Sequence, residues 1–168
     1  LELAREGGHS VPRVVHAGGA ATGAEIERTL VEAVRRTAVI VHTRTFLEDL
    51  VILDGVCRGA WCRFPDGSRR QVWSRNVLLA AGGAGQMFSV TTNPAGATGD
   101  GVAAAMRAGA VVADLEFFQF HPTALYHPSS PRPLLTEALR GHGARLRGAD
   151  GERFVDELLP RDVVSRAI

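Results

Sequence analysis

The chain has 168 residues, enough for one domain with a hydrophobic core or for parts of two. Hydrophobic residues make up 45% and charged residues 22%, which is ordinary for a soluble globular protein. The formal net charge of +1 argues against broad nucleic-acid binding, because that function needs a basic face. No apolar run approaches the roughly 20 residues that cross a bilayer, and no signal peptide opens the sequence. We therefore expect no membrane association and a cytoplasmic location.

The first elements expected along the chain are a helix and a short strand. Thr22 and Glu25 form a capping box that opens a helix to about Thr37, with apolar residues along one face. Residues 39–41 follow as a short buried strand.

A meander is expected next. Two Asp-Gly pairs, at 54–55 and 66–67, separate three apolar runs at 50–53, 56–64 and 70–74. Asp-Gly is a preferred turn pair of hairpins, so these runs predict a small antiparallel sheet. Its middle strand holds both cysteines, Cys57 and Cys62. Their separation of five residues places them on opposite faces, so we expect no disulfide and no shared metal.

Strands and helices alternate after the meander. Residues 77–81 fit a fully buried strand that runs into the glycine-rich turn 82–85. Asp100 caps a helix closed by Gly109, and residues 110–115 form another strand. Alternating strands and helices with an inserted meander predict an α/β nucleotide-binding architecture.

The composition changes after Phe117 to Pro-rich loops. A short helix is expected near 134–140, a hairpin around residues 150–151, and a helix that opens at Pro160. We expect a domain boundary near residue 116.

The glycine-rich turn is a candidate ligand site. Gly82 and Gly83, at the carboxyl end of a strand, let the backbone approach a ligand closely. Glycines after strands are more often plain turns, and Asp100 is first of all a helix cap. The residues alone leave both interpretations open.

Three polar segments, 119–123, 135–141 and 160–162, stand late in the otherwise apolar chain. Together they offer an imidazole, a hydroxyl, a carboxylate and two guanidiniums, enough to grip a small dicarboxylate. Singly, their histidine fits a satisfied core residue, and their threonine and glutamate fit helix caps. Arg161 stands in a first helical turn, which the helix dipole disfavours for a cation. We infer that an anion shares its site.

The amino-acid sequences of these segments resemble those of the succinate dehydrogenase, fumarate reductase and L-aspartate oxidase flavoprotein family. Residues 114–123 mark the family at large, and residues 91–101 match it closely. Residues 5–10, 124–128 and 135–141 are similar to its L-aspartate oxidase branch rather than to the respiratory enzymes.

The resemblance implies a fold and an activity. The fold is part of a Rossmann-like FAD-binding domain with an antiparallel β-meander (residues 1–115), followed by the start of an α+β capping domain (residues 116–168). The activity is FAD-dependent oxidation of L-aspartate to iminosuccinate, with reoxidation by oxygen or fumarate. The reaction would feed quinolinate formation and NAD synthesis, with quinolinate synthase as an expected partner.

The resemblance also implies roles for nine residues. Arg161 would be the catalytic proton-transfer residue, and Glu6 would face the substrate amino group. The dicarboxylate site would be lined by Gln119, His121, Thr136 and Glu137, and the flavin would contact Gly82, Gly83 and Asp100. A free guanidinium has a pKa above about 12, so chemistry alone favours a carboxylate clamp for Arg161.

The sequence departs from the family pattern at three positions. Ala20 stands where aspartate is common, Ala81 where threonine is frequent, and His142 where glutamate is usual. No Gly-x-Gly-x-x-Gly motif for a cofactor pyrophosphate occurs, so we expect an internal fragment of the enzyme that is inactive alone. The alternatives are a flavoprotein subunit of fumarate reductase or succinate dehydrogenase, and a non-catalytic remnant without flavin.

Overall fold

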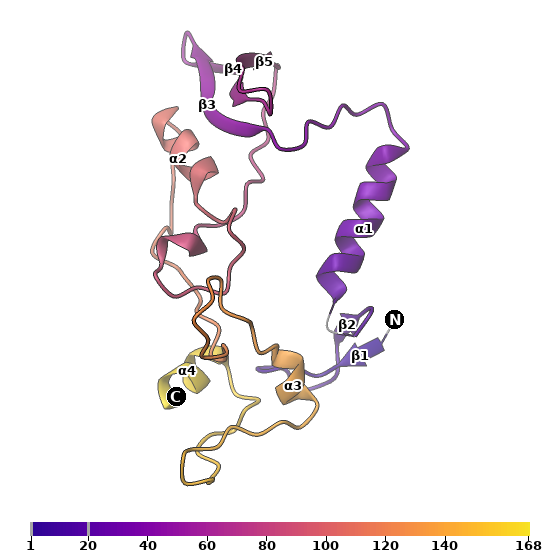
Figure 1. Cartoon of the computed structure of the whole chain (residues 1–168), viewed down its shortest axis with the longest axis vertical. Helices are drawn as coiled ribbons and strands as arrows, with labels where there is room; N and C mark the ends of the chain where they lie inside the picture. Colours follow the sequence, from indigo (N-terminus) through magenta and orange to yellow (C-terminus); the bar gives the residue numbers. More distant parts are fainter. Residues whose placement is uncertain (1, 20) are drawn as a thin grey trace. The chain divides into compact units, whose positions relative to one another are not determined.

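The computed structural model describes residues 2–19 and 21–168 (Figure 1). The departure at Ala20 therefore lies outside the described residues. The elements, in chain order, are β1 (Glu2–Ala4), β2 (Val14–His16), α1 (Thr22–Arg35), β3 (Phe46–Leu53), β4 (Val56–Arg63), β5 (Arg69–Trp73), the 3-10 helix η1 (Gly85–Met87), α2 (Asp100–Arg107), α3 (Glu137–Gly141) and α4 (Arg161–Ala167).

The chain divides into two compact units. Unit 1 contains Leu1–Val39, Phe118–His127 and Pro133–Ile168, and unit 2 contains Ile40–Phe117 and Pro128–Arg132. The described residues form a mixed α/β structure in which both sheets are antiparallel.

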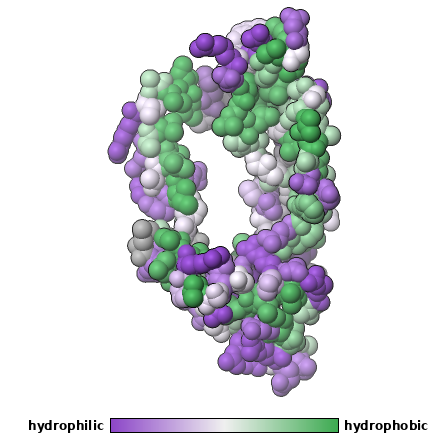
Figure 2. Space-filling model, turned by 180° about the vertical axis from the view of Figure 1, so that it is seen from behind, coloured by the Kyte–Doolittle hydropathy of each residue, from purple (hydrophilic) through white to green (hydrophobic). Residues whose placement is uncertain are grey.

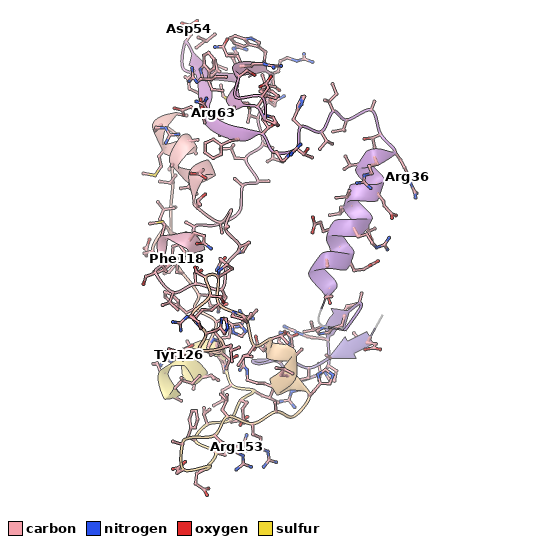
Figure 3. The ribbon with its side chains drawn as sticks, in the orientation of Figure 1. Arg36, Asp54, Arg63, Phe118, Tyr126 and Arg153 are labelled. Atoms are coloured by element: carbon pink, nitrogen blue, oxygen red, sulfur yellow. The ribbon has the colours of Figure 1, made fainter. Side chains whose placement is uncertain are left out.

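Unit 2 contains the predicted meander, with strand order β3-β4-β5. Asp54 and Gly55 both have positive φ, 50° and 74°, which is the backbone of a tight hairpin turn. Asp54 lies at the tip of this hairpin (Figure 3). Glu48 ties the outer strands together, because its two oxygens lie 2.5 Å from the Arg63 and Arg69 guanidiniums. The prediction of an antiparallel meander is confirmed, although β3 begins four residues earlier than expected.

Helix α2 packs against β3 and closes the core of unit 2. Val51 on β3 and Ala104 on α2 are buried, and Arg107 bonds the Glu48 carbonyl at 2.8 Å. The helix ends as predicted, because Gly109 at φ 79° allows the Ala110 N–H to bond back to the Ala105 carbonyl. Its start differs from the prediction. Gly99 is the N-cap, and Asp100, the first helical residue, accepts a hydrogen bond from the Thr98 hydroxyl.

Three predicted strands are absent from the structure. Residues 39–41, 77–81 and 110–115 have no strand pairing, and Ile40, Leu78 and Val111 are 79%, 91% and 98% exposed. A strand needs a neighbour for its N–H and C=O groups, and no described segment pairs with these three. Hydrophobic areas are visible on the surface in Figure 2.

Unit 1 opens with a strand pair that the sequence analysis did not predict. β1 and β2 run antiparallel, with Glu2 opposite His16 and Ala4 opposite Val14. Three-residue strands carry too little pattern to be recognised from sequence, because alternation needs four or more residues to show.

Helix α1 follows this strand pair, but the predicted capping box is wrong. Ala21 is the N-cap, with no side-chain cap. Thr22 instead accepts a hydrogen bond from the Ala17 N–H, and Glu25 pairs with Arg28. The helix ends at Arg35, two residues before the predicted end.

The rest of unit 1 contains the two short helices and the turn expected after Phe117. Thr136 is the N-cap of α3, and its hydroxyl accepts from the Ala138 N–H. The turn at 150–151 is confirmed by the antiparallel bridge between Arg147 and Arg153. α4 begins at Arg161 with Pro160 as its N-cap, and its Val164 is fully buried.

Candidate functional site

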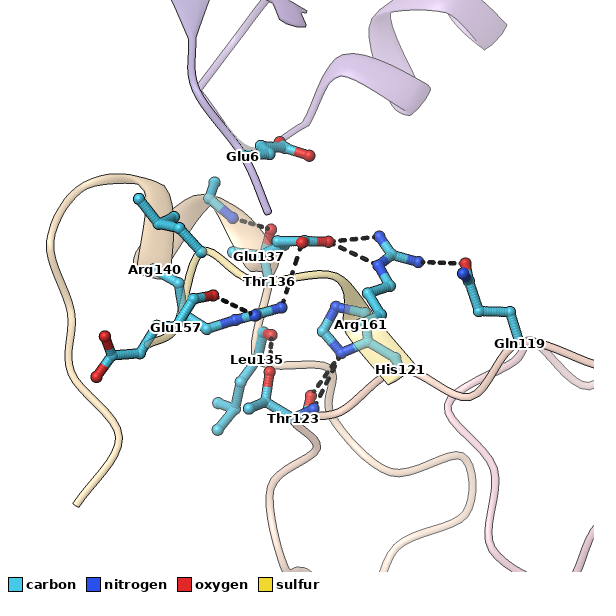
Figure 4. A network of polar contacts seen from close by, with 12 residues as sticks. Glu6, Gln119, His121, Thr123, Leu135, Thr136, Glu137, Arg140, Glu157 and Arg161 are labelled. Carbon is cyan, nitrogen blue, oxygen red and sulfur yellow. Dashed lines mark hydrogen bonds and ion pairs between the residues drawn. The ribbon is translucent and has the colours of Figure 1, made fainter. Parts of the chain in front are cut away.

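A buried carboxylate at the start of α3 is the centre of a polar network in unit 1 (Figure 4). The Glu137 side chain is 6% exposed. Its Oε2 lies 2.7 Å from Nε and 2.6 Å from Nη2 of Arg161, and its Oε1 lies 3.4 Å from Nη2 of Arg140. One carboxylate thus lies between two guanidiniums, which leaves one positive charge in excess.

The guanidinium of Arg161 is held by contacts with two side chains. In addition to Glu137, Nη1 donates to Oε1 of Gln119 at 3.2 Å. The sequence predicted that an anion would offset this cation at a helix start, and the structure identifies Glu137 as that anion. The Arg161 side chain remains 35% exposed, so a ligand can still reach it.

Arg140 is the buried cation of the network. Its side chain is 3% exposed, and Nη1 donates to the Glu157 carbonyl at 2.8 Å. Among residues 2–19 and 21–168, Nε and Nη2 of Arg140 find no hydrogen-bond partner, so the 3.4 Å approach to Glu137 is an ion pair without hydrogen-bond geometry. A buried charge needs such pairing to be tolerated, which makes the positions of Arg140 and Glu137 interdependent.

Glu157 anchors the loop that carries the carbonyl partner of Arg140. Its carboxylate accepts from the Leu146 N–H at 2.8 Å and from Arg153 Nη2 at 2.7 Å. Burial by itself raises the pKa of Glu157, but hydrogen bonds from Arg153 and from backbone N–H groups outweigh burial and lower the pKa to about 2.

His121 lies beside the two guanidiniums. Its Nδ1 is 3.0 Å from the carbonyl oxygen and 3.2 Å from the N–H of Thr123, so one backbone residue orients the ring in either tautomer. Burial lowers the pKa of His121, and the Arg161 and Arg140 charges lower it further against the opposing effects of Thr123 and Glu137. His121 is therefore a neutral imidazole at pH 7.

A bridge between two extended segments brings His121 and Thr136 to one side of unit 1. Ala124 and Leu134 form an antiparallel bridge, and the Thr123 hydroxyl donates to the Leu135 carbonyl at 2.9 Å. This pairing holds the loop that carries His121 against the residue that precedes Thr136.

Glu6 belongs to a loop that is packed closely on this network. A Cβ added at the next residue, Gly7, would lie 2.3 Å from Oε1 of Glu137. The Gly8 N–H donates to the Leu158 carbonyl at 2.8 Å, just before α4. The Glu6 carboxylate itself lies 3.3 Å from Nε2 of His16 on β2. All six residues that the sequence assigned to catalysis and substrate binding thus lie in unit 1.

The three residues assigned to the flavin lie in unit 2. Gly82 has φ 73°, and an added Cβ at Gly82 or Gly83 would meet no atom within 4 Å. The turn is packed tightly against the start of α2, because a Cβ on Gly101 would lie 2.6 Å from that of Ala81. Gly82 and Gly101 also line a cavity of about 240 Å³.

The described part of the chain, residues 2–19 and 21–168, contains no cluster of three metal-ligating side chains. None of its helices combines the length and apolarity of a membrane span. The thiols of Cys57 and Cys62 are both free.

Comparison with known proteins identifies the family. The protein-family model for the FAD binding domain matches residues 1–168. The chain belongs to this family of FAD-binding domains.

Relatives of this FAD-binding chain include named L-aspartate oxidases. That of Streptomyces coelicolor is 49% identical over 100% of this chain and 31% of its own length, and that of Agrobacterium fabrum is 47% identical over 97% and 32%. A solved quinol-fumarate reductase with menaquinol is 30% identical with a TM-score of 0.89, over 99% of this chain and 32% of that one. The open conformation of a flavocytochrome c3 fumarate reductase is 33% identical with a TM-score of 0.75, over the same shares. The chain spans about a third of the length of these relatives.

FAD is the cofactor of this family. The open space above Gly82 and Gly83 is what a ligand close to the backbone requires. Gly99, the N-cap of α2, has no side chain to cap the helix, and the Asp100 carboxylate accepts a hydrogen bond from the Thr98 hydroxyl.

Sequence reasoning gave no role to several residues of the network. Arg140 was counted among the guanidiniums of the polar segments but was given no role, although the Glu-x-x-Arg spacing at a helix start places its side chain on the same face as Glu137. Gly7 and His16 gave no local signal, because their contacts with Glu137 and Glu6 join segments far apart in the sequence.

Proposed function

We propose that the chain is part of a longer flavin-dependent L-aspartate oxidase, which converts L-aspartate to iminosuccinate in the quinolinate branch of NAD synthesis. One observation supports this most directly. The Glu137, Arg161 and Gln119 cluster lies beside His121 in a chain that is 49% identical to an L-aspartate oxidase along its whole length.

The charge and exposure of the cluster suit a dicarboxylate. Two guanidiniums facing one carboxylate leave one positive charge in excess, and Arg161 is partly open to a ligand. Arg161 and neutral His121 would contact the substrate carboxylates, with Gln119 and Thr136 as further hydrogen-bond partners.

Glu6 would bind the substrate ammonium group. L-Aspartate differs from succinate by this group, so a carboxylate beside a cationic cluster selects for it. Glu6 is next to Gly7, which touches Glu137, so the loop carries this carboxylate to the edge of the cluster.

Bound FAD would supply the redox chemistry as acceptor of a hydride from the substrate Cα. Gly82, Gly83 and Asp100 would lie against this cofactor. Arg161 is the proposed proton-transfer residue, and Glu137 and Gln119 hold its guanidinium in one orientation.

Residues 116–168 would be the start of the capping domain, and residues 1–115 would belong to the FAD-binding domain. The enzyme would act in the cytoplasm and pass iminosuccinate to quinolinate synthase. The second candidate is a flavoprotein subunit of fumarate reductase or succinate dehydrogenase, because the solved structures described above are fumarate reductases.

The test compares turnover of L-aspartate and succinate by the full-length protein with bound FAD. A clear preference for L-aspartate is expected, and equal rates or a preference for succinate would move the protein to the respiratory branch. Glu6→Gln should raise KM for L-aspartate and leave fumarate reduction largely intact. Glu27→Gln, on the exposed side of α1, is the matched control and should change neither.

A further inference from the structure

The proposed ammonium-binding carboxylate has a histidine neighbour that no part of the function described so far uses. Nε2 of His16 lies 3.3 Å from Oε1 of Glu6, and the two side chains are only 13% and 22% exposed. Nε2 is buried and has no hydrogen-bond partner within the described residues. The contact is therefore close but outside hydrogen-bond geometry, and a small rotation of either side chain would complete it.

The strand pair of unit 1 sets this contact. His16 is the last residue of β2 and stands opposite Glu2 on β1, while Glu6 follows two residues after β1 ends. The Arg13 N–H donates to the Ala4 carbonyl at 3.1 Å and continues the pairing toward the Glu6 loop. The backbone thus fixes the imidazole and leaves the longer Glu6 side chain to adjust to it.

His16 is also connected with the predicted dicarboxylate site through a cavity. It lines a cavity of about 230 Å³ together with Thr136, the N-cap of α3. Glu2 and His142 line the same cavity, and they are its other titratable side chains. His16 therefore contacts the carboxylate proposed to bind the ammonium group and shares a cavity with the residue whose hydroxyl is proposed to bind a substrate carboxylate.

We propose that His16 is a positioning residue that selects amino-dicarboxylates by fixing the Glu6 carboxylate. This inference rests on the proposed role of Glu6. An imidazole N–H that donates to Oε1 leaves Oε2 available for the ammonium group. An arginine or lysine at this position would instead neutralise the carboxylate and compete with the substrate.

The test measures two constants with the full-length, FAD-loaded protein. The first is KM for L-aspartate. The second is the inhibition constant of succinate against L-aspartate turnover, because succinate lacks the ammonium group. His16→Leu should raise KM by about tenfold, the size expected for a hydrogen bond to a charged group, and leave the succinate constant within about twofold. His16→Gln, which keeps an N–H donor, should recover most of the loss.

Two controls separate positioning from a general loss of structure. Val15→Ala, at a half-exposed position on the same strand, should leave both constants unchanged. In a Glu6→Gln background, His16→Leu should add no further rise in KM, because the two residues act through one contact.

The outcomes distinguish the inference from the proposed function. Suppose that the wild-type protein prefers L-aspartate. An unchanged KM in His16→Leu, or an equal weakening of L-aspartate and succinate binding, would then overturn the role of His16 alone. Wild-type protein that does not prefer L-aspartate would overturn both.

Discussion

Replacing Gly7 by alanine should reduce turnover through a purely steric effect on Glu137. The φ of Gly7 is not positive, so alanine adds no backbone strain. Its Cβ would stand 2.3 Å from Oε1 of Glu137, and real contacts are essentially never under 3.0 Å, so the oxygen must retreat by at least 0.7 Å. Escape on the other side is limited, because the Leu159 carbonyl oxygen would lie 3.2 Å from the same Cβ.

The cost of this retreat falls on the contacts of Glu137 with the two guanidiniums. Its Oε2 is held at 2.6 and 2.7 Å by Arg161, so the carboxylate cannot move without displacing the proposed proton-transfer group. A misplacement of about 1 Å typically costs up to about 10²-fold in rate. We expect kcat for L-aspartate to fall by about one to two powers of ten.

The assay is steady-state turnover of the full-length, FAD-loaded protein, with a thermal melt to show that the variant is folded. Gly23→Ala in α1 is the matched control, because its Cβ would meet nothing within 4 Å and alanine favours a helix. Its kcat should equal the wild-type value. A folded Gly7→Ala variant with wild-type kcat would refute the claim that the Glu6 loop fixes Glu137.

Three further predictions follow from charge and exposure. Arg161→Lys should lose two or more powers of ten in kcat, whereas Arg166→Lys on the same helix should lose nothing; a rise in KM alone would reduce Arg161 to a carboxylate clamp. Glu157→Gln should lower the melting temperature at pH 7. The further decrease of the melting temperature as the pH is lowered from 4.5 to about 2 should be smaller in this variant than in the wild-type protein. A group with a lowered pKa stabilises the fold above its ordinary pKa and loses that effect on acidification, so an unchanged slope would contradict it. Residues 1–168 expressed alone should neither bind FAD nor melt cooperatively, as measured by flavin absorbance and calorimetry. Their accessible surface is 12269 Å², whereas two separate compact bodies of half the mass would together expose only about 9,700 Å². A yellow monomer with a sharp melt would disprove this.

Local signals predicted local structure well. The Asp-Gly turns of the meander, Gly109 at the end of α2 and Thr136 at the start of α3 all have the predicted backbone role. Each of these depends on a few neighbouring residues, so the sequence contains the whole cause. The exact N-caps at Thr22 and Asp100 were wrong by one residue, because the preceding Ala21 and Gly99 already turn the chain.

The predicted strands at 39–41, 77–81 and 110–115 show where sequence reasoning reached its limit. Their apolar runs indicate burial between neighbouring strands, but a run of apolar residues does not name the neighbour. The residues of the candidate site were recognised because they belong to short sequence motifs that resemble the family. The contacts that join these residues are long-range and could not be recognised in this way. Glu137 meets Arg161 across 24 residues and Gly7 across a still longer stretch of chain.

The position of Glu137 changes the meaning of the Arg161 prediction. A guanidinium at a helix start was expected to share its site with a bound anion, and the anion beside it belongs to the protein. Arg161 is therefore held in place before any substrate arrives, by a hydrogen bond and an ion-pair contact with Glu137 and a hydrogen bond to Gln119. Lysine cannot reproduce this planar, forked arrangement, since its ammonium is a point charge on a flexible stem. Loss of turnover in Arg161→Lys must consequently be compared with Gln119→Leu, which removes one of the three contacts and keeps the guanidinium. If Gln119→Leu lowers kcat as strongly, orientation accounts for the effect; if it leaves kcat nearly intact, the chemistry of the guanidinium itself is required.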